Sequence, residues 1–216
     1  MPPRFTPFVN GEIYHIVSRG SNKKAIFLTP RDYKRFIKGL AYYKFDGPKP
    51  SFSKLSQLEL LGIAPKLTSR FVDILCFCLM PNHIHLLIRQ VKGNGTSNFV
   101  RQLLNSYAKY FNTKHKHTGP LFESRFRAVP ITYDEQFIHV SRYIHINPVV
   151  SHIVDKLENY PWSSYWDYRR GKSTLCSVRE ILDYFGSPRE YSKFLKDQIS
   201  YGESLEQIKH QVLEDI

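Results

Sequence analysis

The residues with the clearest chemical potential are two histidines, His83 and His85, in the stretch LMPNHIHLLI (79–88). One apolar residue, Ile84, separates them and a Pro-Asn turn signal precedes them, so we expect both on one face at the start of a strand. Residues i and i+2 of a strand are about 6 to 7 Å apart, which lets two imidazoles reach one metal ion or one phosphate. A polar sheet face would also carry two histidines, so the rest of the chain has to decide.

Tyr143 and Asn147 form a second pair, in the stretch RYIHINPVV (142–150). Their i, i+4 spacing places both on one face of a helix, one above the other. If this helix crosses the sheet face that carries the histidines, two imidazoles and an amide oxygen surround one site, with a phenol beside it. Such nitrogen and oxygen ligands suit a divalent ion such as Mg²⁺ or Mn²⁺ less perfectly than zinc, but without thiolates they do not demand zinc. An ordinary amphipathic helix would also contain such a tyrosine.

The composition favours one globular domain with a polyanionic partner. Of the 216 residues 42% are hydrophobic, and 31 Lys and Arg against 19 Asp and Glu give a net charge of +12. Such an excess is typical of nucleic-acid-binding proteins, although a merely basic protein remains an alternative. The first residues lack the apolar core of a signal peptide, and no apolar run approaches the roughly 18 residues of a membrane span. We therefore expect a cytoplasmic protein with no membrane partner.

Hydrophobic periodicity predicts the elements that position these residues. The expected strands are 12–19, 70–79, 83–89 and 121–131, and the expected helices are 29–43, 96–111 and 134–147, with Pro148 ending the last helix. This order predicts an α+β fold, a ferredoxin-like antiparallel sheet flanked by helices that pack on one face. The histidines then begin the second arm of a central hairpin. Three cysteines, Cys76, Cys78 and Cys176, are too few and irregular for a disulfide framework and are expected in the core.

Two segments differ in composition from this core. Residues 45–69 are rich in Pro, Ser and Lys and are expected to form an insertion or surface loop, with a short helix over 55–61. After Val149 the pattern becomes mostly helical, with helices expected at about 177–185, 188–199 and 204–216.

Basic side chains gather in the loop NTKHKHTGP (112–120) and in the strand that follows it. Lysine and arginine in such places are suited by type to contact phosphates of a nucleic-acid backbone. The candidate DNA contacts are Arg19, Lys114, Lys116, Arg125 and Arg127.

Five stretches carry a family resemblance: YHIVSRG (14–20), LMPNHIHLLI (79–88), GPLFESRFRAVPI (119–131), RYIHINPVV (142–150) and YPWSSY (160–165). In this order they resemble the HUH-type one-tyrosine transposases of the IS200-like superfamily, in particular the REP-associated tyrosine transposases. The resemblance implies that His83 and His85 are metal ligands, that Tyr143 is the nucleophile and that Asn147 is a further ligand. It also implies a transposase (nuclease) domain over 1–165 and a helical C-terminal extension over 166–216.

The activity implied by the resemblance is cleavage and rejoining of single-stranded DNA at REP-type hairpins. A divalent metal, Mg²⁺ or Mn²⁺, polarises the scissile phosphate while the tyrosine attacks, which gives a 5′-phosphotyrosine and a 3′-OH. Such an enzyme is an endonuclease and strand transferase that needs no ATP. We expect single-stranded or hairpin DNA as partner and a monomer or homodimer as the assembly. Residues 45–69 and those after about 170 depart from the family pattern and leave the details of the substrate open.

Three alternatives remain at this point. Tyr107 and Tyr110 are rival nucleophiles, although their helix matches a scaffold helix of the family rather than its nucleophile motif. A histidine-triad nucleotide hydrolase would need a third histidine where this chain has Leu87. A non-catalytic DNA-binding regulator with the same fold is possible, against which the intact Tyr143 argues.

Overall fold

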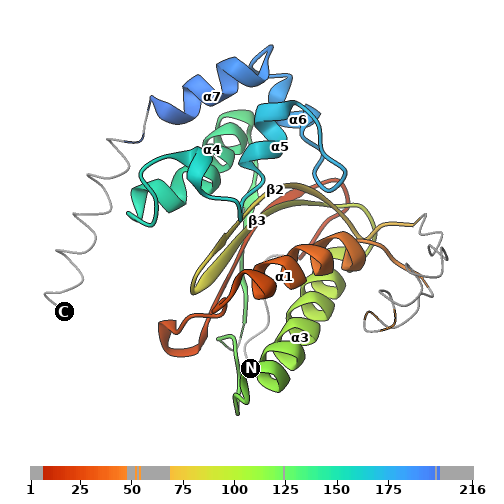
Figure 1. Ribbon diagram of the computed structural model, residues 1–216. Helices are drawn as coiled ribbons and strands as arrows, with labels where there is room; N and C mark the ends of the chain where they lie inside the picture. The colour runs from red at the N-terminus through yellow and green to blue at the C-terminus, as the bar shows by residue number, and fades with distance from the viewer. Residues whose placement is uncertain are drawn as a thin grey trace, which may run out of the picture.

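The computed structural model describes residues 7–47, 52, 54, 69–123, 125–197 and 199. Its centre is an antiparallel sheet of β1 (Ile13–Arg19), β2 (Val72–Met80), β3 (His83–Gln90) and β4 (Arg127–Ile131), in the order β2-β3-β1-β4 (Figure 1). One helix follows β1 and another follows β3, so the chain has the βαββαβ order of a ferredoxin-like fold. The predicted fold class is confirmed, and the strand with both histidines lies between two neighbours.

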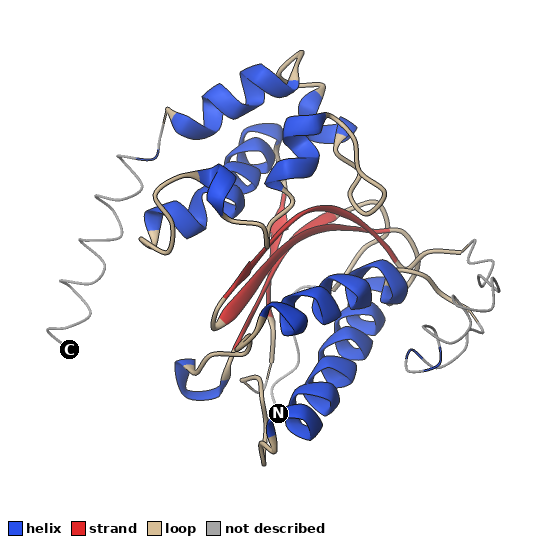
Figure 2. Ribbon diagram, viewed as in Figure 1, coloured by secondary structure: helices blue, strands red, loops and turns tan. Residues whose placement is uncertain are grey.

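Helices cover both faces of this sheet, so the expectation of helices on one face was wrong. On one side lie α1 (Pro30–Tyr43) and α3 (Gly95–His115), and on the other lie α4 (Asp134–Val150), α5 (Tyr165–Arg170), α6 (Arg179–Leu182) and α7 (Pro188–Lys196) (Figure 2). Two short 3₁₀ helices, Ser21–Lys23 and Leu157–Asn159, lie in the connections. The physical reason is that both strands of the β2–β3 hairpin are apolar on both faces, and nearly all of their side chains are buried.

Two predicted boundaries were also wrong. Helix α4 does not stop before Pro148 but continues to Val150, because a proline in the last turn removes only one hydrogen bond, and Ser151 N–H still reaches Asn147 O at 2.9 Å. The last strand spans only Arg127–Ile131 instead of 121–131. Upstream of it, an isolated bridge joins Phe122 to Gly20, where β1 has already ended and its chain turns away.

The C-terminal helices pack against the same core as the sheet. The helix expected at 177–185 is reduced to α6, the one at 188–199 is described as α7, α5 was not predicted, and 204–216 lie outside the described residues. Backbone bridges from Ser163 to Cys78 and from Cys176 to Ile74 cover the outer edge of β2. The three cysteines are buried thiols, as predicted.

The two ends of the segment expected to form an insertion, 45–69, lie side by side. Phe45 forms a bridge with Arg70, and Asp46 N–H donates to Ser69 O at 2.8 Å. The helix expected at 55–61 lies outside the described residues.

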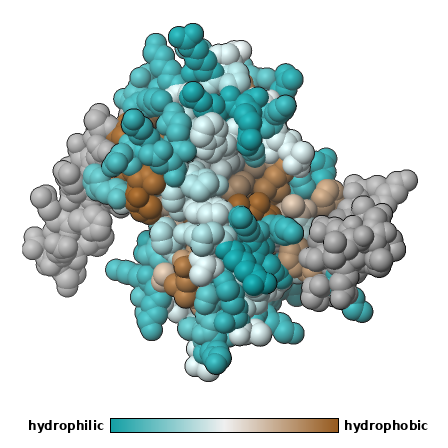
Figure 3. Space-filling model, in the orientation of Figure 1, coloured by the Kyte–Doolittle hydropathy of each residue, from teal (hydrophilic) through white to brown (hydrophobic). Residues whose placement is uncertain are grey.

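The surface agrees with a layered molecule. In the view of Figure 3, hydrophilic side chains cover both helical layers, and hydrophobic ones show near the middle, between the layers. None of the helices in the described ranges is long and apolar enough to cross a membrane.

Candidate active site

The turn that precedes the two histidines is held by the loop that follows β1. Gly20 N–H donates to Asn82 O and Ile26 N–H donates to Pro81 O, each at 2.8 Å. Asn82 returns a bond from its amide Nδ2 to Lys23 O at 3.2 Å. At Gly20 an added Cβ would lie 2.2 Å from Lys24 O, so only glycine allows the loop to close this tightly. The loop therefore fixes the start of β3.

His83 and His85 lie on the sheet face that is covered by α4. Their ring centroids are 4.8 Å apart, which confirms that both point the same way. Asn82 Oδ1 is 2.6 Å from His83 Nδ1, and because an amide oxygen only accepts, this Nδ1 carries the hydrogen. The lone pair of His83 therefore lies on Nε2.

His85 is almost fully buried, with 4% of its surface exposed. Its Nδ1 is 3.0 Å from Nε2 of His15 on β1. Its Nε2 is also buried but finds no hydrogen-bond partner among the described residues. Burial lowers the pKa of His85 well below its usual range, with smaller contributions from His83, His15 and Arg19, and burial lowers the pKa of His15 to about 4. Both rings are therefore neutral near pH 7.

Tyr143 stands beside this histidine pair. Helix α4 packs on β2 and β3, and it places the Tyr143 ring 5.3 Å from the His85 ring and 6.1 Å from the His15 ring. Tyr143 is 42% exposed, so its phenol is accessible from solvent. Asn147 follows one turn later and is buried, and its Oδ1 accepts a long bond of 3.5 Å from Ser151 Oγ. The structure thus brings Tyr143 to the histidines and places Asn147 next to it along α4.

The rival tyrosines are engaged on the opposite side of the sheet. Tyr107 is 1% exposed, and its hydroxyl donates to Ile26 O at 2.6 Å. Tyr110 donates its hydroxyl to Asp32 Oδ1 at 3.0 Å. Neither phenol is placed to attack a substrate at the histidine pair.

His145, which lies between Tyr143 and Asn147 in the sequence, points into the core and anchors α4. Its Nδ1 is 2.7 Å from the Tyr191 hydroxyl of α7, and its Nε2 is 2.8 Å from Ser164 Oγ. The Ser164 oxygen also accepts the backbone N–H of Phe77 in β2, at 2.9 Å. The imidazole of His145 therefore links α4 to α7 directly and to β2 through Ser164.

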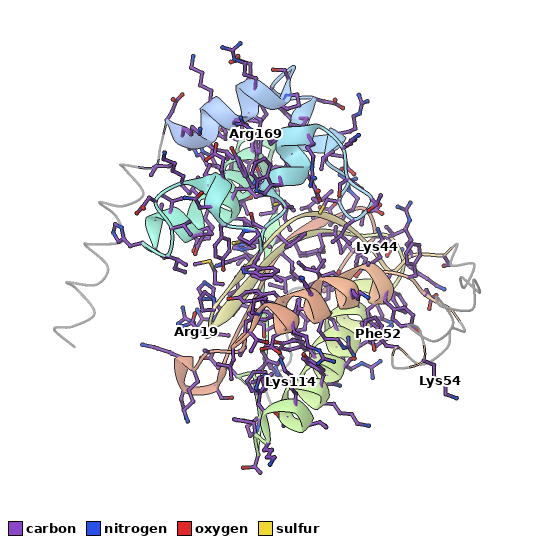
Figure 4. The ribbon with its side chains drawn as sticks, in the orientation of Figure 1. Arg19, Lys44, Phe52, Lys54, Lys114 and Arg169 are labelled. Carbon is purple, nitrogen blue, oxygen red and sulfur yellow. The ribbon has the colours of Figure 1, made fainter. Side chains whose placement is uncertain are left out.

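The predicted phosphate contacts fall into two groups. In the sheet register Val17 lies between His85 and Arg127, and Arg19 lies opposite His83, so both arginines share the histidine face. Arg19, Lys116, Arg125 and Arg127 are exposed. Lys114 is placed differently, because its Nζ lies 2.7 Å from the buried carboxylate of Asp32 on the α1 and α3 side (Figure 4).

His15 is the site residue that the sequence reasoning missed. It alternates with the buried residues Tyr14 and Ile16 along β1, so its position on the opposite face of the sheet from these two could have been predicted. Its contact with His85 depends on the pairing of β1 with β3, which are separated by more than 60 residues. Local spacing carries no information about that register.

Two imidazoles and one amide oxygen are the side chains that would bind a divalent metal ion here. No group of three or more His, Cys, Asp or Glu side chains within the described ranges is placed to hold an ion. The expected set instead has two imidazoles and an amide. A neutral imidazole whose buried Nε2 has no other partner suits a metal ligand, because a bound cation would satisfy an atom that is otherwise costly to bury.

Comparisons with known proteins show similarity to transposases. Residues 57–147 match a family model described as transposase IS200 like. A Haemophilus influenzae protein named for the REP-associated tyrosine transposases is 24% identical over 103 residues, which cover 43% of this chain and 58% of that relative. The solved structure of a REP-associated tyrosine transposase bound to a REP hairpin has 18% identity and a TM-score of 0.57, over 84% of this chain and 93% of the other. Residues 57–147 are therefore similar to IS200-like transposases, and the chain shares its fold with the solved REP-associated tyrosine transposase.

Proposed function

We propose that this protein cleaves and rejoins single-stranded DNA at hairpin-bearing sites through a covalent phosphotyrosine. The observation that carries the proposal is the exposed phenol of Tyr143, whose ring lies 5.3 Å from that of a buried histidine with an unsatisfied Nε2. A nucleophile and a potential metal ligand thus meet on two packed elements, α4 and β3. The transposase match over residues 57–147 ends at Asn147 and includes all four proposed catalytic and metal-binding residues.

In the proposed reaction the Tyr143 hydroxyl attacks the scissile phosphorus. A bond forms between the phenolic oxygen and phosphorus, the bond from phosphorus to the 3′ oxygen breaks, and that oxygen leaves as a 3′-OH. The phenol gives up one proton and the 3′ oxygen takes one up, so no water is consumed. Because the phosphodiester energy is kept in the new ester, a second 3′-OH reverses the step and joins strands without ATP.

The proposed metal site consists of His83, His85 and Asn147. A bound Mg²⁺ or Mn²⁺ would supply charge to neutralise the phosphate oxygens as the bond breaks. The chain's own contribution is orientation. The neighbouring Asn82 holds the His83 ring, and His145 fixes the turn of α4 from which Tyr143 and Asn147 extend.

The proposed DNA surface is the sheet face beside the histidines and the loop at the end of α3. Arg19 and Arg127 flank the histidines there, with Arg125 in the segment before β4 and Lys116 in that loop. Lys114 is held by Asp32, so we assign its main role to that contact rather than to DNA. The protein acts as a monomer or homodimer, and the parts 1–165 and 166–216 work together through the His145 contacts.

The decisive test is a denaturing gel with a single-stranded REP-like hairpin oligonucleotide labelled on the 3′ side of the cut. We expect labelled DNA to migrate with the denatured protein in Mg²⁺ or Mn²⁺, and peptide mapping to place the link at Tyr143. Tyr143→Phe should lose the adduct and keep DNA binding, since it lacks only the hydroxyl. Tyr133→Phe removes another exposed phenol, at the start of α4, and is the matched control.

Two results would overturn the proposal. Cleavage that releases both ends without an adduct indicates a hydrolase with a water nucleophile. DNA binding without any cleavage indicates a non-catalytic regulator.

A further inference from the structure

His85 must keep a lone pair on Nε2 if it is to bind a metal ion, and this depends on where its one ring hydrogen lies. A neutral imidazole carries that hydrogen on either Nδ1 or Nε2. The group hydrogen-bonded to one nitrogen decides the state of the other. For His85 this group is the imidazole of His15, with Nε2 at 3.0 Å from His85 Nδ1.

In either direction Nε2 of His85 lacks a partner among the described residues, but a buried N–H without an acceptor is rarer in proteins than an acceptor without a donor, which favours one direction. If His15 donated, His85 would carry its hydrogen on Nε2, as a buried donor without an acceptor among the described residues. If His85 donates from Nδ1, its Nε2 presents a lone pair instead. The second arrangement repeats that of His83, whose Nδ1–H donates to Asn82.

We propose that His15 is a positioning residue, which accepts the Nδ1–H of His85 and thereby aims the Nε2 lone pair of His85 at a divalent cation. This inference rests on the proposed function for the presence of the cation, but not for the direction of the hydrogen bond. His15 also packs on the edge of the Tyr143 ring, with centroids 6.1 Å apart, so one side chain of β1 supports ligand and nucleophile. Its location at the centre of the sheet makes it a rigid support, since β1 is paired on both sides.

Two substitutions separate positioning from mere filling of space. His15→Gln keeps an acceptor oxygen near the place of the imidazole Nε2, whereas His15→Leu keeps similar volume and removes the acceptor. We expect His15→Leu to weaken binding of Mn²⁺ about 10- to 100-fold, as is usual when the hydrogen-bond partner of a ligand is lost, and His15→Gln to restore most of it. His117→Leu, which removes another partly buried histidine with a side-chain partner, should leave Mn²⁺ binding unchanged.

The second measurement needs no metal and no activity. Long-range ¹H–¹⁵N correlation spectra of the metal-free wild-type protein report which ring nitrogen of His85 carries the hydrogen. We expect Nδ1–H in the wild type and a shift toward Nε2–H in His15→Leu.

The outcomes distinguish this inference from the proposed function. An Nε2–H form of His85 in the wild type, or equal Mn²⁺ affinity in wild type and His15→Leu, overturns the role of His15. Equal losses in His15→Leu and His15→Gln also overturn it and favour His15 as a direct ligand. If the wild type binds no Mn²⁺ while His85 carries Nδ1–H, the proposed metal site fails and the hydrogen-bond direction stands.

Discussion

His85 and His145 are both buried, but they differ in how many of their ring nitrogens have a hydrogen-bond partner. His145 has a partner on each nitrogen, from Tyr191 and Ser164, and joins three elements. His85 has a partner on Nδ1 only, and its buried Nε2 lies in the region that Tyr143 faces. Satisfied buried polar groups contribute stability and fix one arrangement, whereas an unsatisfied one costs stability and is retained for a use. The contrast gives His145 a structural role and agrees with the metal-binding role proposed for His85.

A similar contrast separates Asp32, on one face of the sheet, from the histidine pair on the other face. On the face covered by α1 and α3, Asp32 has no exposed side-chain surface and accepts hydrogen bonds from Lys114, Thr29, Tyr110 and the backbone of Leu28. The carboxylate of Asp32 is therefore fully partnered. On the face covered by α4, the histidine pair borders an exposed tyrosine and two exposed arginines of β1 and β4. Substitutions at Asp32 should therefore change mainly the stability of the fold, whereas substitutions at the histidine pair should change mainly DNA cleavage.

The largest effect is expected from His85→Ala. Loss of a group that supports transition-state charge costs about a thousand-fold in rate, at the upper end of such effects, so single-turnover cleavage should fall by about that factor. The melting temperature should fall less than in His145→Ala, because one hydrogen bond rather than two is lost and removal of the unpartnered Nε2 offsets part of the cost of the cavity. Cleavage kinetics with labelled single-stranded DNA and a thermal melt of the same sample measure both quantities. Wild-type cleavage rates in this variant would remove His85 from the chemistry.

His145→Ala should show the reverse pattern. It removes one buried hydrogen-bond partner from each of Tyr191 and Ser164 and opens a cavity, so the free energy of unfolding should fall by about 3 kcal/mol. Urea denaturation followed by circular dichroism measures this change. Mn²⁺ affinity measured well below the denaturation midpoint should stay within a few-fold of wild type. If His145→Ala stayed as stable as the wild type but lost Mn²⁺ binding, the contrast between His145 and His85 would be wrong.

The pH dependence of stability should depend on Asp32. Burial alone would raise the pKa of this carboxyl, but hydrogen bonds from Lys114, His115, Leu28 and Thr29 outweigh it and hold the pKa below its usual range. A carboxyl with a lowered native pKa stabilises the fold above its unfolded pKa of about 4, and this stabilisation is lost as the pH falls below that value.

Asp32→Asn should therefore lower the free energy of unfolding by about 2 kcal/mol at pH 7 and flatten its decrease between pH 5 and 3. Asp183→Asn, at an exposed position, is the matched control. Urea titrations at pH 7, 5 and 3 measure the effect. An unchanged acid transition in Asp32→Asn would show that other carboxyls dominate it.

The smallest effect is expected for the phosphate contacts. Each lost contact should reduce the slope of log K against log salt by about one unit, so Arg127→Ala and Arg125→Ala should each show this change. Arg101→Ala removes an exposed arginine of α3, on the other side of the sheet, and should leave the slope unchanged. Fluorescence anisotropy over a salt series measures the slopes. Equal slopes for all four proteins would place the DNA elsewhere.

The features that could be predicted from the sequence are those set by local spacing. A period of two places His83 and His85 on one face, and a spacing of four places Tyr143 and Asn147 along one side of α4. The alternation of apolar residues gave the order of the strands and helices, and with it the ferredoxin-like fold. These features depend on neighbours within a few residues.

The features that could not be predicted depend on distant partners. Lys114 has the charge of a DNA contact, but its carboxylate partner, Asp32, lies 82 residues away. His15 reaches His85 only through strand pairing, and Pro148 is tolerated in α4 because the chain beyond it continues to pack and to hydrogen-bond. Apolar patterns show that β2 and β3 are buried, but not that separate helical layers bury their two faces.

The backbone pairing of residues 44–46 with 69–71 has a consequence for how this chain tolerates changes in length. Lys44 O accepts Phe71 N–H and Ser69 O accepts Asp46 N–H, each at 2.8 Å, so the two ends of the intervening segment are joined before it begins. Because residues outside the intervening segment make both bonds, a change in the number of residues between Asp46 and Ser69 leaves those bonds in place. The start of β2, and with it the register of the histidine strand, is therefore set by these bonds and not by the length of the segment.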